Sequence, residues 1–321
     1  MIKLILCRIF TLPLILFGVA AFTFTLVALS PFDPIRAYVG AETGVSKATK
    51  AEIAREWGLD QPPLQQFFTW LGHIVKGDLG NSRLVAGRPV LEVIGSRLGP
   101  SVALVGCAFI AVLIGGLILG TFAVMFRDSW FDWCVRSIGY VMTAAPSFWV
   151  ALLLLQVFAV QLRWLPAGGT NDLRAPTSGT LDLRYWILPV LTLAVTQQSW
   201  FTLFVRNSLL EISREDYVQF SRAHGMDELA VLFRHALPNA LLPFATLIGS
   251  HLGELMAGSI LVETIFDWPG LGNLAQRAGL SADLPLLLGI TLLGSFFVIA
   301  GNLLADLLYR VLDPRIREPL E

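Results

Sequence analysis

The chain has 321 residues, of which 55% are hydrophobic and only 15% are charged, and its mean hydropathy is +0.67. A soluble protein of this length has too little interior to bury so much apolar sequence, whereas a lipid bilayer sets no such limit. The formal net charge of −1 predicts no nucleic-acid partner. Three widely spaced cysteines without a CxxC pair argue against a disulfide framework or a zinc site.

Six segments are apolar over about 20 residues, the length that a helix needs to cross about 30 Å of hydrocarbon. They are residues 9–30, 100–126, 137–162, 186–205, 240–265 and 284–308. The first segment follows Lys3 and Arg8, as a signal peptide would. Its apolar run is longer than usual, however, and no small-x-small cleavage site follows cleanly before Pro31, which favours an anchored helix. The pattern predicts an all-α integral membrane protein with six transmembrane helices.

Basic residues in the short loops predict the orientation of the chain. With the N-terminus in the cytoplasm, eleven Lys and Arg residues lie in the inner pieces and four in the short outer loops. This is the bias expected of cytoplasmic loops, so both termini are predicted to be cytoplasmic. The predicted organisation is a transmembrane helix over 1–30, an extracytoplasmic segment over 31–98, a five-helix core over 99–309 and a cytoplasmic tail over 310–321.

The extracytoplasmic segment is predicted to be ordered. Thr49 and Glu52 fit a capping box that begins a helix through Trp57. A second, amphipathic helix is predicted to begin near Pro63, with its apolar residues recurring on one face. That face comprises Leu64, Phe67, Phe68, Leu71 and Val75. Such helices either cap the outer mouth or form a docking surface for a delivery protein.

The inner segment over 207–239 is too polar to span the membrane and too long for a simple connection. A helix is predicted over 215–224 and a second helix over 227–237, with a turn at Gly225, because glycine adopts a positive φ without a steric penalty. Pro238 and Pro243 limit how the chain re-enters the membrane. From the pattern alone, this helix–turn–helix either rests on lipid headgroups or transmits force from a cytoplasmic partner.

At this segment the chain resembles the permease subunits of binding-protein-dependent ABC importers. Gly225 is followed thirteen residues later by Pro238, as in their cytoplasmic loop, although Gln219-Phe220-Ser221 replaces the usual EAA start. The strings DYVQFSRAHG and RHALPNALLP resemble the peptide/nickel branch of that family. Further matching pieces follow along the chain: GDLGNS (77–82), SWFDW (129–133), PSFWVALLL (146–154), WLPAGG (164–169), LPVLTLA (188–194), VETIFDWPGLG (262–272), NLLADLLY (302–309) and DPRIR (313–317).

The resemblance implies a type I importer fold in a bacterial inner membrane. It implies four kinds of neighbour: a homologous second permease, two ABC ATPase subunits, an extracytoplasmic solute-binding protein and the bilayer. The loop helix around Ser221–Arg234 would be the coupling helix that fits a groove on an ATPase. The coupling residues implied are Asp216, Tyr217, Ser221, Arg222, Ala223, His224, Gly225, Arg234, His235, Pro238 and Asn239.

No residue pattern in the chain supplies the energy for transport. A phosphate-binding P-loop ends in Lys followed by Ser or Thr, and none of the four lysines precedes either residue. The histidines form no HExxH motif, and no Ser or Cys has the surroundings of a catalytic nucleophile. We therefore predict a conduit that is not an enzyme and holds no cofactor, with ATP and Mg bound by partner ATPase subunits.

Polar side chains inside the spans are candidates for the translocation path, because ionisable groups in the bilayer are costly. His251 and Glu254 are three residues apart and share one helix face, and Gln197 and Gln198 lie midway along the fourth span. The string HLGEL (251–255) is more similar to nickel-type than to dipeptide-type permeases, but two groups do not make a metal site. Asn302 and Asp306 are better explained by hydrogen bonds between helices.

Three further local patterns concern helix packing, an outer turn and the element before the last span. Gly116 and Gly120 form a GxxxG pattern, which permits close helix approach. A turn at Trp268, Pro269 and Gly270 is one candidate for contact with the binding protein, and the extracytoplasmic segment is the other. Relatives usually have an Arg-Asp-Tyr-Pro-like element before the last span, where this chain has Ala282-Asp283-Leu284-Pro285.

The leading hypothesis is thus a permease for small peptides or for nickel, free or chelated. The alternatives are a secondary transporter or channel that works alone, and a membrane-anchored sensor that transports nothing. The first requires co-purification with ATPase subunits, and the others do not. The sequence does not choose between peptide and metal chelate, because the binding protein mainly sets specificity.

Overall fold

A computed structural model describes residues 2–29, 60–85, 87–170 and 182–312, together with the single positions 35, 52 and 55. Within this part of the chain the regular elements are helices, and the extended backbone is limited to one isolated bridge between Asn81 and Pro89. The all-α prediction is confirmed. The helix predicted to run through Trp57 lies outside the described residues, apart from the single positions 52 and 55.

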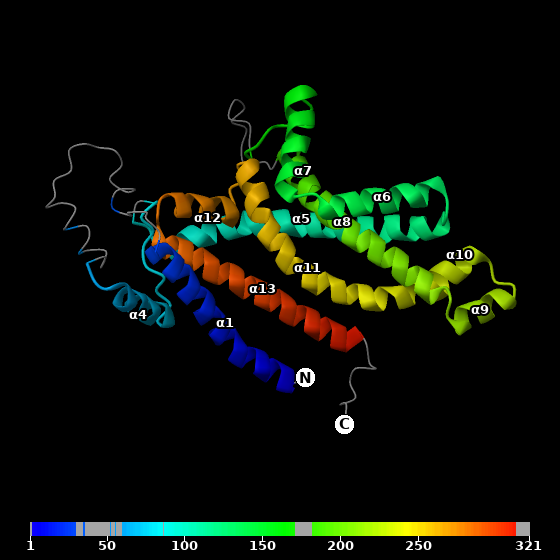
Figure 1. The fold of residues 1–321 in the computed structure, drawn as a ribbon, viewed down its shortest axis with the longest axis horizontal. Helices are drawn as coiled ribbons and strands as arrows, with labels where there is room; N and C mark the ends of the chain where they lie inside the picture. Colours follow the sequence, from blue (N-terminus) through cyan, green and yellow to red (C-terminus); the bar gives the residue numbers. More distant parts are fainter. Residues whose placement is uncertain are drawn as a thin grey trace. The chain divides into compact units, whose positions relative to one another are not determined.

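Five long helices coincide with five of the predicted spans (Figure 1). They are α1 (Ile2–Leu29), α5 (Val90–Met125), α8 (Arg184–Ile212), α11 (Leu237–Ile265) and α13 (Leu284–Leu312). Among the described residues, α5, α8 and the stretch 284–303 of α13 are long and apolar enough to cross a membrane. The apolar part of α1, Thr11–Leu26, is shorter. With 29 residues, α11 is about 43 Å long, which exceeds the thickness of the hydrocarbon.

The sixth predicted span is not one straight helix. The prediction of a single helix over 137–162 is wrong, because α6 (Trp130–Ala144) and the helix over Ser147–Gln161 meet at an angle of 110°. The cause is Pro146, which has no N–H to donate and disfavours helical backbone in the residue before it. Ala145 accordingly adopts an extended conformation, with φ −79° and ψ 125°. Beyond the break, α7 (Ser147–Leu154) continues as the π-helix η1 (Leu155–Gln161).

The chain forms two compact units, and α5 and α13 each pass from one into the other. The first unit comprises residues 1–101 and 269–297 and contains α4 (Pro63–Val75) and α12 (Leu271–Leu280). Its main core joins the start of α5 to α12 and α13 through residues such as Val90, Leu274 and Leu286.

Helix α4 packs on α1 through part of its predicted apolar face. Phe67 is buried, with its ring 5.3 Å from that of Phe24, and Leu71 packs on the same cluster. Three other residues of that face are exposed, by 72%, 56% and 82%: Leu64, Phe68 and Val75. The helix predicted to begin near Pro63 is thus confirmed, with part of its apolar face buried and part exposed, and its role as a cap or a docking surface stays a prediction.

The second unit comprises residues 102–268 and 298–321 and is built around α8, which contacts α6, α7 and α11. Gly116 and Gly120 of α5 lie against α8, and a Cβ atom added to them would come within 2.6 Å of Phe201 Cβ and 2.7 Å of Val205 Cβ. The close helix approach predicted from the GxxxG pattern is thus confirmed. The buried side chains of Phe201, Val205 and Leu209 continue this core along α8.

Candidate functional site

The inner segment forms a hairpin of two short helices, α9 (Asp216–Ala223) and α10 (Glu228–Val231). Gly225 makes the turn with φ +81°, and its N–H donates to the Arg222 carbonyl at 2.9 Å. The Asp227 carboxylate then caps α10 by accepting a hydrogen bond from the Leu229 N–H at 3.1 Å. The predicted helix–turn–helix is confirmed, except that the second helix does not end near 237 but continues through a π-helical stretch into the next long helix.

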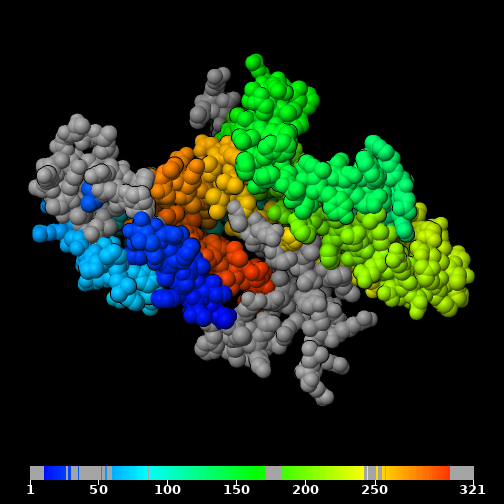
Figure 2. All heavy atoms as spheres, in the orientation of Figure 1, coloured from blue at the N-terminus to red at the C-terminus, as the bar shows by residue number. Residues whose placement is uncertain are grey.

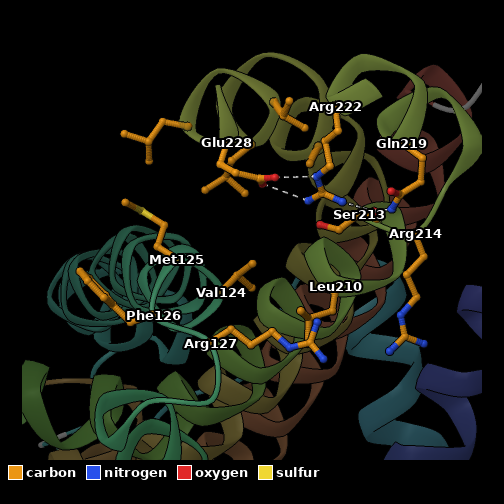
Figure 3. A pocket seen from close by; sticks show the side chains of 14 residues that line it. Val124, Met125, Phe126, Arg127, Leu210, Ser213, Arg214, Gln219, Arg222 and Glu228 are labelled. Carbon is orange, nitrogen blue, oxygen red and sulfur yellow. Dashed lines mark hydrogen bonds and ion pairs between the residues drawn. The ribbon is translucent and has the colours of Figure 1, made fainter. Parts of the chain in front are cut away.

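The hairpin is fixed to the end of α8 by two side chains of α9. Gln219 Nε2 and Arg222 Nη1 both donate to the Ser213 carbonyl, at 2.8 and 2.9 Å. This carbonyl lies just beyond the last turn of α8, where main-chain acceptors lack helical partners. Arg222 also pairs with Glu228, with Nε 3.0 Å from Oε1 and Nη2 3.2 Å from Oε2 (Figure 3). The pair joins α9 to α10 across the turn.

The hairpin is fixed to α11 as well, because the chain continues from α10 into α11 without a break. The link is the π-helix η2 (Leu232–Ala236), which leads directly to Pro238 in the first turn of α11, where a missing N–H is tolerated. Asn239 Nδ2 donates to the His235 carbonyl at 2.7 Å. Asn239 also hydrogen-bonds Tyr217 of α9, which lowers the pKa of that phenol. Partial burial and nearby Glu215 outweigh this bond, so the pKa of Tyr217 is raised overall.

The outer face of the hairpin carries large exposed apolar side chains. Phe220 is 65% exposed, and its ring stacks on His224 with centroids 4.0 Å apart. Tyr217, Leu229 and Phe233 are also exposed, by 43%, 51% and 52%. In the space-filling view the hairpin (yellow-green) lies at the surface of its unit (Figure 2). Exposed apolar surface of this kind marks a contact site for a protein or a membrane.

The sequence-predicted coupling residues fall on this one structure. Asp216, Tyr217, Ser221, Arg222 and Ala223 lie on α9, and His224 and Gly225 form the turn. Arg234 and His235 lie on η2, and Pro238 and Asn239 begin α11. Their coupling role stays a prediction.

A cavity of about 430 Å³ separates the hairpin from the ends of α5 and α8. Figure 3 shows Met125, Phe126 and Arg127 on the α5 side, facing Arg222 and Glu228 across it.

A buried ion pair next to this region was not foreseen from the sequence. Arg206 of α8 clasps Asp132 of α6 with two hydrogen bonds, Nε to Oδ1 at 2.6 Å and Nη2 to Oδ2 at 2.8 Å. The Asp132 side chain is fully buried, and Arg136 lies 3.6 Å from it. Asp132 belongs to the SWFDW string, and Arg206 is one of the eleven basic residues of the inner pieces. Only the fold shows that they meet.

The comparisons with known proteins fit this geometry. Residues 113–318 match the family model described as the binding-protein-dependent transport system inner membrane component, and residues 1–93 match the model of its N-terminal part. The chain belongs to this family. It is a permease subunit of an ABC importer, a multi-pass inner-membrane protein that does not itself catalyse ATP hydrolysis.

Several characterised or named relatives are similar to this permease along nearly its whole length. It is 33% identical to the oligopeptide transport system permease protein AppB of Bacillus subtilis, over 94% of this chain and 95% of that protein. It is 38% identical to a putative peptide transport system permease protein of Brucella abortus, over 99% of both chains. It is 35% identical to the glutathione transport system permease protein GsiC of Salmonella paratyphi A, again over 99% of both.

Solved structures of ABC importers share the fold over about 70% of this chain. An inward-facing structure of the MetNI methionine ABC transporter is similar with a TM-score of 0.58 at 16% identity, over 70% of this chain and 97% of that chain. An amino acid ABC transporter crystallised with histidines is similar with a TM-score of 0.54 at 17% identity, over 69% and 94%. At this identity the likeness shows the fold alone.

The residues predicted to line the translocation path of the permease are not all gathered in one place. Gln197 lines a second cavity, of about 220 Å³, beside the break between α6 and α7. Gln198 Nε2 donates to Thr202 Oγ1 at 3.1 Å, within α8. His251 is 9% exposed and lies between aromatic rings, with the Phe201 centroid 5.3 Å away. The Glu254 side chain lies outside the described residues, so its proximity to His251 is untested.

The predicted docking turn of the permease has little free surface. Trp268 is 1% exposed and packs edge-on against Trp186, with centroids 4.7 Å apart. Pro269 is half-buried and Gly270 is buried. The Trp268 indole therefore supports the fold from inside its unit, and contact with a binding protein stays a prediction for the turn.

The Asp283 carboxylate is a second polar anchor that sequence reasoning missed. Its Oδ2 accepts hydrogen bonds from Ser82 Oγ at 2.7 Å and from the Arg83 and Leu84 N–H groups at 2.7 and 2.8 Å. Its Oδ1 accepts from the Leu286 N–H at 3.2 Å, which caps α13. Burial lowers the pKa of nearby Arg83 to about 10, against the opposing effect of Asp283. The signal was present, since Asp283 is the acidic residue of the element that departs from the family pattern.

Proposed function

We propose that this permease imports peptides and is driven through its α9–α10 hairpin by separate ATPase subunits. It would work as one half of a translocation path, beside a homologous second permease, above two ATPases and below a solute-binding protein. ATP and Mg would be bound by those ATPases.

The hairpin is the observation that supports this proposal. It carries exposed aromatic side chains on its outer face, and its inner side is fastened to both α8 and α11. A partner that grips Phe220 and Tyr217 would therefore move the ends of two long helices together. A helix that merely rests on headgroups needs no such fastening.

The proposed topology has six crossings with both termini in the cytoplasm. Five are the long helices, and the sixth is the bent pair of α6 with α7 and η1 taken as one broken span. The excess of Lys and Arg in the inner loops gives the orientation.

The proposed cargo is a small peptide. The named relatives include oligopeptide, peptide and glutathione permeases, and glutathione is itself a small peptide. Nickel, free or chelated, remains the alternative cargo, and its support is the HLGEL string around His251.

Substitution of Gly225 tests the coupling role of the hairpin. A Cβ atom at Gly225 meets nothing within 4 Å, so the strain of a side chain there comes from the φ of +81° alone. Gly225→Val should therefore distort the turn, whereas Gly225→Asn is the matched control, because Asn tolerates this backbone region. In proteoliposomes that hold the whole importer, the Gly225→Val variant should still hydrolyse ATP. Its peptide uptake per ATP hydrolysed should be at least tenfold below that of the unaltered importer.

Two results would count against the proposal. Uptake by Gly225→Val at the rate of the unaltered permease would refute the coupling role of the turn. Uptake by the purified permease without ATPases and nucleotide would instead favour a transporter that works alone.

A further inference from the structure

The second cavity lies where the sixth predicted span breaks, and we call it the break cavity. Its volume is about 220 Å³, and it lies wholly within the second unit. Three elements contribute to it: the break between α6 and α7, the middle of α8, and α11. The lining residues are Met142, Thr143, Ala145, Ser147, Leu193, Thr196, Gln197, Trp200, Leu255 and Gly258.

Two threonine hydroxyls of the lining present acceptors to the cavity. The Thr143 hydroxyl donates to the Gly139 carbonyl at 2.9 Å, and the Thr196 hydroxyl donates within α8 to the Thr192 carbonyl at 3.1 Å. Because each hydroxyl hydrogen is already used, what these groups offer to the cavity is oxygen lone pairs.

Gln197 adds a further acceptor to this lining. Its Oε1 atom is buried and has no hydrogen-bond partner among the residues that the structure describes. Buried polar atoms are nearly always paired, so an unpaired oxygen beside a cavity calls for a donor from outside the chain. Trp200, half exposed at the same cavity, offers an aromatic face that attracts N–H groups and cations.

The chemistry of the lining separates the two cargo classes. Among the lining residues that the structure describes, none carries a carboxylate, an imidazole or a thiol, the groups that bind nickel in proteins. Amide and hydroxyl oxygens instead suit the N–H groups of a peptide. The volume is below the roughly 300 Å³ at which pockets for whole small ligands begin, so the cavity takes one end or one amide unit.

We propose that the break cavity is a binding station on the path, where Gln197 Oε1 accepts a hydrogen bond from the N-terminal ammonium or a main-chain N–H of a passing peptide. This inference rests on the proposed function, since it needs a peptide as cargo.

The test uses the complete importer in proteoliposomes, with a tripeptide presented on its binding protein. Gln197→Leu keeps the approximate volume and removes the acceptor, and it should lower the maximal uptake rate about tenfold, the effect of one hydrogen bond. Gln197→Glu, which keeps an oxygen at the same place, should retain at least half of the uptake. ATP hydrolysis stimulated by the loaded binding protein should stay within twofold for both, because docking and coupling lie elsewhere.

A second variant tests the cavity without changing Gln197. A Cβ atom at Gly258 meets nothing within 4 Å, so Gly258→Leu would occupy the cavity with little strain. Its control is Gly106→Leu in α5, where a Cβ atom also meets nothing within 4 Å. Uptake should fall with the first substitution and not with the second.

A cargo variant then identifies the donor. A tripeptide methylated at its main-chain N–H groups and trimethylated at its terminus, so that no N–H donor remains, should be taken up equally by the unaltered importer and by Gln197→Leu, provided that it still binds the binding protein. Full-rate uptake of the ordinary tripeptide by Gln197→Leu would overturn the inference and leave the proposed function standing. Failure of the proposed function looks different, because the unaltered complex would then show no ATP-dependent uptake.

Discussion

Removing one partner of the Asp132–Arg206 pair should destabilise the permease strongly. The pair makes two short hydrogen bonds of 2.6 and 2.8 Å, and the Asp132 side chain is fully buried. Asp132→Asn keeps the shape but leaves a largely buried guanidinium without its counter-charge. Breaking a buried pair in this way costs about 3–5 kcal/mol, most of it from the uncompensated charge.

The matched control is Asp128→Asn, four residues earlier. Asp128 is 77% exposed on its side chain and pairs with Arg127 at 3.3 Å at the surface, where such a pair contributes at most about 1 kcal/mol. Its φ of +59° is also one that Asn tolerates. The two substitutions therefore make the same chemical change at a buried and at an exposed pair.

The free energy of unfolding is measured on the purified permease in mixed micelles, as the mole fraction of SDS rises and helical circular dichroism falls. Asp132→Asn should lose several kcal/mol while Asp128→Asn loses less than 1 kcal/mol, as expected for surface pairs. Replacing both members of the buried pair, Asp132→Leu with Arg206→Met, should recover most of the loss, since no charge then remains buried. Equal losses in the two Asn variants would refute the reasoning.

Three further outcomes follow from the packing and the hydrogen bonds. Gly116→Ala should cost about 1–3 kcal/mol, because the added Cβ comes within 2.6 Å of a core side chain, whereas Gly106→Ala meets no atom and should be neutral or stabilising in the same assay. Asp283→Asn should speed trypsin cleavage in residues 80–85, because two main-chain N–H groups there lose a carboxylate acceptor, and an unchanged cleavage rate would contradict this. The difference in absorbance between the unaltered permease and the Tyr217→Phe variant reports ionisation of the Tyr217 phenol. This ionisation should occur with a pKa above the ordinary value of 10. Since the folded state raises this pKa, the stability that Tyr217 contributes is full below pH 10 and is lost as the pH rises further; an ordinary pKa would contradict it.

Features set by neighbouring residues were predictable from the sequence. The turn at Gly225 needs only a residue that adopts φ of +81°, and the helices on either side follow from local pattern and capping. The role of Gly116 and Gly120 was likewise predictable from their spacing, because only small residues at these positions allow a second helix to pack so closely. Five of the long helices were also predictable, because a long apolar run is a local property of the sequence.

Features that depend on distant partners were not predictable. Asp132 and Arg206 are 74 residues apart, and Asp283 lies 201 residues from Ser82, so nothing local identifies the partners of these carboxylates. The break at Pro146 is an intermediate case. Proline restricts the residue before it, but whether a span bends or tolerates a proline depends on what the neighbouring helices offer.

Helix α8 connects the features that matter for the proposed function. Ser213, just beyond its end, receives the hydrogen bonds of the hairpin, Arg206 holds α6, and Gln197 lines the break cavity. From Ser213 to Gln197 the helix runs for about 24 Å without interruption, so a displacement of the hairpin reaches Gln197 through a single rigid element. The other wall of the cavity belongs to the far end of α6, the helix that Arg206 grips at its start. A movement of the hairpin would therefore displace α8 and, through Arg206, α6 as well, so under the proposed function a partner's motion at the inner face reaches both walls of the cavity that holds the peptide.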